Sequence, residues 1–316
     1  MRTRDFGRLG QVSALTLGGG GIGAVWGETS RAEAIATVHA ALDAGITLVD
    51  VAPSYGPDFE AERVAGAALK GREALLATKA QVHDDEFPDP VARMVESLED
   101  SLRRLGRESV DMFLLHTQLR PAGTDGPKGT LDYDRYATEV APAFDRLRTE
   151  GKIRSWGLTA VGHPQSIIDA IGNTAHRPDY AQVIVNALDM NGDMWIYGDL
   201  PSRNVEIVAA ANAAGVGVIA IRAVAAGSLA SSLDRTMAPD YPAAVDFARA
   251  EPFRKLAAEL GESPAALAHR WALTAPGVAT VVLGVKNRDE LAECVAAEAR
   301  GPLSDAEMAA IAALRA

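Results

Sequence analysis

The sequence has little of several features that mark particular protein classes. Cys294 is the only cysteine among 316 residues, so an intrachain disulfide and a cysteine-built zinc site are both excluded. No run of about 18 apolar residues is present, which argues against a membrane span. The polar segment Met1–Gly10 lacks the apolar core of a secretory signal. We therefore expect a cytoplasmic protein.

Positive charge is also scarce. Lysine and arginine number 31 against 42 aspartates and glutamates, which gives a net charge of −11, and no basic block stands out. Such a chain is a poor partner for phosphate backbones and anionic lipids, so we expect no nucleic acid and no membrane among its partners. No linker or shift in composition divides the chain, and residues 1–316 are expected to form one domain.

The sequence does have a regular alternation of strand and helix patterns. Short apolar runs between glycine, proline or polar residues predict eight buried strands. These are residues 14–17, 47–51, 74–78, 111–115, 155–158, 182–185, 216–221 and 280–283. Amphipathic stretches predict the helices between them. These are residues 31–44, 90–105, 142–149, 164–175, 202–214, 264–274 and 288–297.

Buried strands that alternate with helices imply a parallel sheet covered by helices. Eight such units fit a closed (β/α)8 TIM barrel, and an open doubly wound sheet is the alternative. Residues 4–13 predict a β-hairpin that would close the N-terminal end of the barrel. Extra helical sequence lies near the C-terminus. Three long segments without periodicity, residues 117–136, 187–201 and 223–248, each follow a predicted strand, where barrels build their active sites.

A glycine-rich run follows the first predicted strand. Gly18-x-Gly20-x-x-Gly23, with Asp43 about 20 residues further on, matches a dinucleotide-binding fingerprint in form. However, no helix opens directly behind it, because the next helical pattern begins near Arg31. A glycine loop that lets another group approach the backbone is the favoured interpretation, and a Rossmann motif is the alternative.

Four reactive side chains stand at or just after three consecutive strand ends. Asp50 ends the second predicted strand, Tyr55 lies in the following loop, and Lys79 and His116 end the third and fourth. Each alone has an ordinary explanation, such as a loop cap, a lysine that reaches solvent or a packed tyrosine. Successive strand ends are neighbours in a parallel barrel, so the four are expected to meet in one pocket.

The residue types indicate proton transfer to or from an oxygen on carbon. An unperturbed tyrosine has a pKa of about 10, and the Lys79 ammonium is expected to lower the pKa of Tyr55. Asp50 would hold Lys79 charged, and a neutral His116 would donate a hydrogen bond to a substrate oxygen. These residues include no metal cluster and no covalent nucleophile, so redox chemistry requires a hydride-carrying cofactor.

With these residues the sequence resembles the aldo-keto reductase superfamily almost from end to end. The motifs that carry the resemblance are DVAPSYG at 50–56, the strand ending in Lys79, Leu115-His116, EGKIRSWGLT at 150–159, Gln182-x-x-x-Asn186 and RWAL at 270–273. The resemblance implies a (β/α)8 barrel and NAD(P)(H)-dependent carbonyl reduction or alcohol oxidation. It also implies that Tyr55 is the acid/base, with Asp50, Lys79 and His116 completing the tetrad.

The resemblance further implies which residues bind the cofactor. They are Gly19, Gly20, Asp50, Thr159, Gln182, Arg222, Gly284, Lys286, Arg288 and Glu293. Glu290 stands where NADP-preferring members often have arginine, and Cys294 where asparagine is usual. Lys286 and Arg288 favour NADP(H), since both could bind a 2′-phosphate, and NAD(H) is the alternative.

The expected substrate is a small carbonyl compound, alcohol or sugar, and a weaker similarity points to sugar dehydrogenases of the family. Trp26, Tyr55, His116 and Trp195 are expected to line the substrate pocket. An alternative function is a cofactor-sensing regulatory or partner subunit with the same barrel and little turnover. The intact tetrad favours the enzyme.

Overall fold

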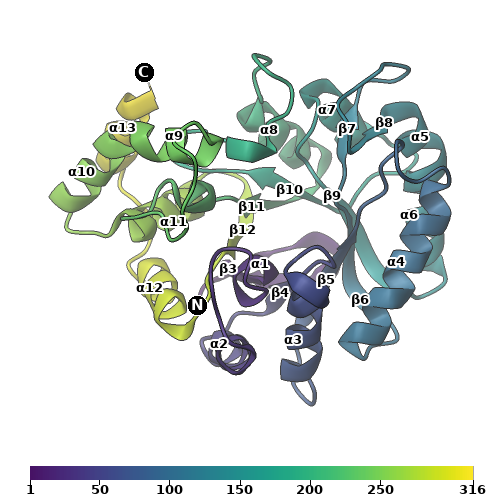
Figure 1. Cartoon of the computed structure of the whole chain (residues 1–316), viewed down its shortest axis with the longest axis horizontal. Helices are drawn as coiled ribbons and strands as arrows, with labels where there is room; N and C mark the ends of the chain where they lie inside the picture. The colour runs from purple at the N-terminus through teal and green to yellow at the C-terminus, as the bar shows by residue number, and fades with distance from the viewer. Residues whose placement is uncertain (316) are drawn as a thin grey trace.

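The computed structural model describes residues 1–315. Its parallel strands close into an eight-stranded barrel, in which each strand pairs with the next and the last returns to the first. In chain order they are β3 (Leu15–Gly18), β4 (Leu48–Asp50), β5 (Leu75–Ala80), β6 (Val110–Leu115), β9 (Ile153–Thr159), β10 (Tyr180–Ile184), β11 (Gly217–Ile221) and β12 (Val278–Leu283). All eight predicted strands and the (β/α)8 class are confirmed, and the open sheet is excluded (Figure 1).

Helices surround the barrel. They are α2 (Arg31–Asp43), α3 (Glu60–Ala68), α4 (Pro90–Leu105), α6 (Ala141–Thr149), α7 (Pro164–Gly172), α8 (Asn204–Ala214), α11 (Pro264–Thr274) and α12 (Arg288–Ala299). The seven predicted helices begin and end within three residues of their expected bounds, and α3 was not predicted. Side chains of Ser30, Asp89 and Ser263 accept hydrogen bonds from the first turns of α2, α4 and α11, which fixes where these helices start.

The predicted N-terminal hairpin is confirmed. Strands β1 (Thr3–Asp5) and β2 (Gln11–Ser13) pair antiparallel around a 3-10 turn, η1 (Gly7–Leu9). Phe6 stacks on Tyr180 with ring centroids 4.2 Å apart, and the Tyr180 hydroxyl donates to the Phe6 carbonyl at 2.6 Å. Together with Leu9 and Val12, Phe6 packs against strand residues inside the barrel. The hairpin therefore plugs the N-terminal end and leaves the opposite end for a ligand.

The segments after the strands contain more regular structure than their patterns predicted. Behind β6 lie β7 (Gln118–Arg120), β8 (Thr130–Asp132), α5 (Tyr133–Arg135) and the π-helical turn η3 (Tyr136–Val140). Elsewhere lie α1 (Gly19–Ile22), η2 (Pro57–Phe59), η4 (Gly192–Met194), η5 (Ala225–Gly227), α9 (Pro242–Arg249) and α10 (Glu251–Glu259). The expected extra helices are α13 (Asp305–Ala312) and the turn η6 (Ala313–Arg315), which lie beside α10 in Figure 1.

Within residues 1–315, no helix combines the length and the apolar character that crossing a membrane requires. That residues 1–316 form one domain stays a prediction.

Candidate active site

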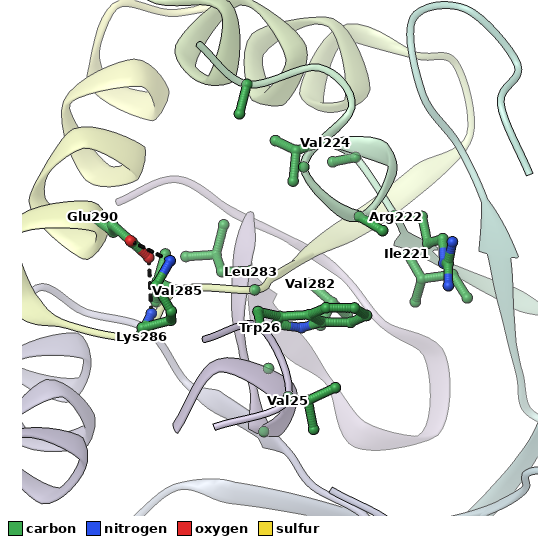
Figure 2. A pocket seen from close by; sticks show the side chains of 18 of the residues that line it. Val25, Trp26, Ile221, Arg222, Val224, Val282, Leu283, Val285, Lys286 and Glu290 are labelled. Carbon is green, nitrogen blue, oxygen red and sulfur yellow. Dashed lines mark hydrogen bonds and ion pairs between the residues drawn. The ribbon is translucent and has the colours of Figure 1, made fainter. Parts of the chain in front are cut away.

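A cavity of about 560 Å³ lies at the C-terminal end of the barrel strands. Most of the residues predicted for catalysis, cofactor or substrate line it. These are Gly19, Gly20, Trp26, Asp50, Tyr55, His116, Thr159, Gln182, Arg222, Gly284, Lys286 and Glu293. Figure 2 shows Trp26 in the middle of the view, with Arg222 on one side and Lys286 and Glu290 on the other.

A buried ion pair forms the floor of the site. Lys79 is fully buried, and its Nζ lies 2.8 and 2.9 Å from the two Asp50 carboxylate oxygens and 3.0 Å from the Val51 carbonyl. Burial alone would lower the pKa of Lys79, but Asp50 and Tyr55 outweigh it, so the pKa is raised. Lys79 therefore stays charged beneath Tyr55, and a buried charge of this kind is tolerated only because it is paired.

Tyr55 lies directly over this pair. The Lys79 ammonium is 4.6 Å from the centre of the Tyr55 ring. Burial raises the pKa of Tyr55 above its usual value; Lys79 opposes the shift and Asp50 adds to it. The predicted lowering of the Tyr55 pKa is therefore wrong for the free protein, because removing a phenolate from water outweighs the attraction of one ammonium. Tyr55 is held as a phenol, the form that can give up a proton.

His116 faces Tyr55 from the end of β6. Its backbone N–H donates to the Ala80 carbonyl at 2.7 Å, which keeps the ends of β5 and β6 together. The two rings meet edge to face, with centroids 5.6 Å apart. Burial lowers the pKa of His116 to about 3, with a further contribution from Lys79. The expected neutral imidazole is confirmed, so His116 can form hydrogen bonds here without carrying a charge.

Two polar groups beside the tetrad have no partner within the described chain. Thr159 on β9 and Gln182 on β10 are paired in register, and the Thr159 Oγ1 and Gln182 Nε2 atoms are buried without a hydrogen bond. Buried polar atoms of this kind usually have a partner. A hydroxyl and an amide N–H side by side fit a carboxamide, the polar group of nicotinamide. Asn186, by contrast, is satisfied by both backbone groups of Met190.

The glycine run lets Trp26 and the segment after β12 pack closely against it. The expectation that no helix opens directly behind β3 is wrong, because the run itself forms the one-turn helix α1. A Cβ on Gly20 would lie 2.5 Å from Trp26 Nε1, and a Cβ on Gly21 would lie 1.9 Å from the Val285 carbonyl oxygen. The expected close approach is therefore made by the protein's own Trp26 and Val285. The barrel topology excludes the Rossmann alternative.

At the far end of the cavity, Lys286 already forms ion pairs with two carboxylates. Its Nζ lies 2.8 Å from Asp234 Oδ2 and 2.6 Å from Glu290 Oε1. Its backbone N–H donates to Glu290 Oε2 at 2.9 Å, and Figure 2 marks the contacts between Lys286 and Glu290 with dashed lines. Burial alone would lower the pKa of Lys286, but the two carboxylates raise it overall. Arg288 does not line the cavity; it pairs with Glu33 at 2.9 Å on the surface.

Arg222 is positioned by a neighbouring loop. Its backbone is left-handed, with φ 56°. Its guanidinium lies 2.8 Å from Asp193 Oδ1, while the second oxygen of Asp193 accepts a hydrogen bond from the Tyr241 hydroxyl at 3.0 Å. Trp195 does not line the cavity: its indole donates to the Gly198 carbonyl at 3.1 Å, and Met194 reaches the cavity instead.

The sequence patterns did not single out several residues that line the cavity. They are Met194, Asp234, Arg235 and His269. The Arg235 guanidinium lies 5.2 Å from the centre of the Trp26 ring. The first three belong to aperiodic segments and His269 to the face of a helix, so no local pattern points to them. Within residues 1–315, no cluster of three or more His, Cys, Asp or Glu side chains is arranged to bind a metal.

This chain is similar to known proteins over almost its whole length. The aldo/keto reductase family model matches residues 14–316. The chain is 27% identical over 300 residues to an L-galactose dehydrogenase of Arabidopsis thaliana, covering 93% of this chain and 87% of that protein. Its fold matches an aldo-keto reductase from Bacillus halodurans with a TM-score of 0.74 at 24% identity, covering 100% of this chain and 97% of the other.

A second solved structure is that of an aldo/keto reductase from Klebsiella pneumoniae in complex with NADP and acetate. It matches with a TM-score of 0.70 at 26% identity, covering 99% of this chain and 95% of the other. The match of the family model to nearly the whole chain agrees with the barrel and with the residues gathered at its C-terminal end. The chain is an oxidoreductase that belongs to the aldo/keto reductase family.

Proposed function

We propose that this protein reduces the carbonyl group of a small aldehyde, ketone or sugar with NAD(P)H, and oxidises the corresponding alcohol in reverse. One observation carries the proposal. A protonated Tyr55 lies between a buried Lys79–Asp50 ion pair and a neutral His116, at the wall of a single cavity. In this arrangement Tyr55 can deliver a proton to a substrate oxygen, and Lys79 can then stabilise the negative charge that is left on Tyr55.

Each of the four tetrad side chains has its own role in the reaction. His116 donates a hydrogen bond to the substrate oxygen and orients the carbonyl. Tyr55 gives its proton to that oxygen as negative charge develops there. Lys79 stabilises the phenolate that remains, and Asp50 keeps Lys79 charged and fixed at 2.8 Å. A bound nicotinamide cofactor supplies the hydride, or accepts it in the reverse direction.

The cofactor is held by residues along the cavity. Thr159 and Gln182, whose buried polar atoms lack partners, would hold the carboxamide. Arg222 would contact the nicotinamide or the pyrophosphate, since a planar guanidinium can stack and bind phosphate. Gly19, Gly20 and Gly284 line the same cavity, and Lys286 and Glu293 at its far end would lie near the adenosine part of the cofactor. NADP bound to the Klebsiella pneumoniae structure supports NADP(H), and NAD(H) is the alternative.

The substrate class follows from the relatives and the cavity wall. The Arabidopsis thaliana relative is an L-galactose dehydrogenase, which favours a sugar or a related small polyol. Trp26 contributes an aromatic face on which a sugar ring can pack.

The test combines turnover with binding. Purified protein is assayed for NADPH and NADH consumption with a panel of aldehydes, ketones and aldoses, and for the reverse reaction with sugars. Cofactor binding is followed separately by nicotinamide fluorescence. We expect saturable turnover with at least one substrate. Tight cofactor binding without turnover across both panels would overturn the proposal and favour a cofactor-sensing subunit.

A further inference from the structure

The far end of the cavity contains a histidine that the proposed reaction does not use. His269 on α11 and Cys294 on α12 line this end together with Glu290 and Glu293. Both His269 and Cys294 are only 4% exposed. A buried imidazole at a cavity wall has a defined hydrogen-bonding state, and the surrounding atoms reveal which one it is.

The tautomer of His269 follows from its backbone partner. Nδ1 lies 2.8 Å from the Ala265 carbonyl oxygen, which can only accept, so Nδ1 carries a hydrogen. Burial lowers the pKa of the ring below its usual value, although the bond to Ala265 and the charge of Glu293 oppose the shift. The ring is therefore neutral with its one hydrogen on Nδ1, which leaves Nε2 as a bare acceptor.

Cys294 does not satisfy this acceptor. Its Sγ lies 3.8 Å from Nδ1 and 3.9 Å from Nε2, so it is almost equidistant from the two nitrogens. A sulfur on the lone-pair axis of Nε2 would be much farther from Nδ1, so the thiol is not aligned with that lone pair. Burial raises the pKa of Cys294, so it remains an uncharged thiol. Nε2 is an acceptor in need of a donor.

The proposed function would bring a hydrogen-bond donor of the cofactor to His269 Nε2. With the nicotinamide beside Tyr55, Thr159 and Gln182, the other end of a bound dinucleotide would reach the end of the cavity lined by α11 and α12. We propose that His269 Nε2 accepts a hydrogen bond from the exocyclic amino group of adenine, which makes His269 a specificity-determining residue for the base of the cofactor. A 6-oxopurine would instead place a carbonyl oxygen against the Nε2 lone pair. Glu293 is the competing acceptor on the same wall: its Oε1 accepts from the Ser263 hydroxyl, but its other oxygen can accept as well, so the test includes this residue.

The test compares NADPH with its hypoxanthine analogue, which differs only in the group at position 6 of the purine. Dissociation constants are measured by nicotinamide fluorescence, without turnover. For the unmodified protein we expect the analogue to bind about tenfold more weakly, since a donor is lost and two acceptors face each other. In H269L the two constants should become nearly equal, because no acceptor remains to discriminate between them.

Three further variants sharpen the result. C294A should keep the preference for adenine, since the thiol is not aligned with Nε2. H269Q should reduce the preference, because a glutamine amide can turn to donate to a carbonyl. E293Q tests the competing acceptor, and a preference that disappears there but persists in H269L overturns the proposal.

The two dissociation constants of the unmodified protein test the inference even if H269L does not fold. Equal binding of the two dinucleotides by this protein overturns the inference while the proposed function stands. Failure of both dinucleotides to bind overturns the proposed function as well.

Discussion

The two ends of the cavity are built differently. At the catalytic end, Lys79 is fully buried and Asp50 is 2% exposed, and both stand on adjacent barrel strands. At the far end, Lys286 joins Asp234 and Glu290, whose side chains are 36% and 35% exposed and come from a loop and a helix. The backbone ladder fixes the first cluster, whereas the second depends on ion pairs between side chains.

This structural difference suits the two ends of the cavity to different tasks, proton transfer at the catalytic end and cofactor selectivity at the far end. A buried ion pair on two barrel strands holds the proton-transfer groups in one geometry. Removal of either partner leaves the other as an unpaired buried charge. A partly exposed cluster on loops can open to admit a ligand, because each of its ion pairs is weak and screened by solvent. We therefore expect substitutions at the catalytic end to abolish turnover or stability, and those at the far end to change cofactor affinity.

The largest effect is expected for Tyr55→Phe. The change removes the transferable proton and leaves the ring in place, so kcat should fall by roughly 10²–10⁴-fold or more. Cofactor binding, measured by fluorescence, should stay close to that of the unmodified protein. Turnover within a few-fold of the original would rule out Tyr55 as the proton donor.

The next largest effect is expected for Lys79→Met. Asp50 would be left as a buried charge without its partner, which destabilises a protein by about 3–5 kcal/mol. Urea unfolding measures this loss, and steady-state assays should find no turnover. The matched control is Asp50→Asn combined with Lys79→Met, which should regain much of the stability because no buried charge remains. If turnover also returned in the double variant, the Lys79 charge would not be needed for catalysis.

The catalytic end could be predicted from sequence because strand ends are local signals. Asp50, Lys79 and His116 each end an apolar run, and in a parallel barrel neighbouring runs end at the same rim. The hairpin plug followed from a short pattern in the same way. The direction of the Tyr55 pKa shift could not be predicted, because it depends on how completely the ring is buried.

The far end could not be predicted because its arrangement depends on contacts between distant segments. Lys286 and Arg288 are two residues apart, yet Lys286 turns into the cavity toward Asp234, while Arg288 turns out to Glu33. Asp234 lies in an aperiodic loop, 52 residues before its partner. Trp195 likewise turns back on its own loop instead of lining the pocket.

A smaller effect is expected at this end for Glu290→Gln. The amide oxygen can still accept from the Lys286 N–H, but one of the two carboxylate charges on Lys286 is removed. If NADPH binds here, its 2′-phosphate should then bind up to about tenfold more tightly, with NADH nearly unchanged. Fluorescence titration measures both constants. Arg288→Ala is the control and should leave both unchanged, because Arg288 lies outside the cavity; a loss of NADPH affinity in this control would show that Arg288 does reach the phosphate.

The smallest effect is expected from pH, and it concerns the catalytic end alone. Carbonyl reduction needs Tyr55 protonated, and its raised pKa moves the loss of activity with rising pH beyond the range in which an ordinary tyrosine titrates. His116, with a pKa of about 3, stays neutral at higher pH, so it adds no step in the range where histidine usually titrates. The profile of kcat/KM for reduction should therefore be flat between about pH 5 and 9. His116→Gln should lower the rate but keep this flat shape, since neither side chain titrates there. A step near pH 6.5 that disappears in His116→Gln would show instead that His116 takes up a proton during the reaction.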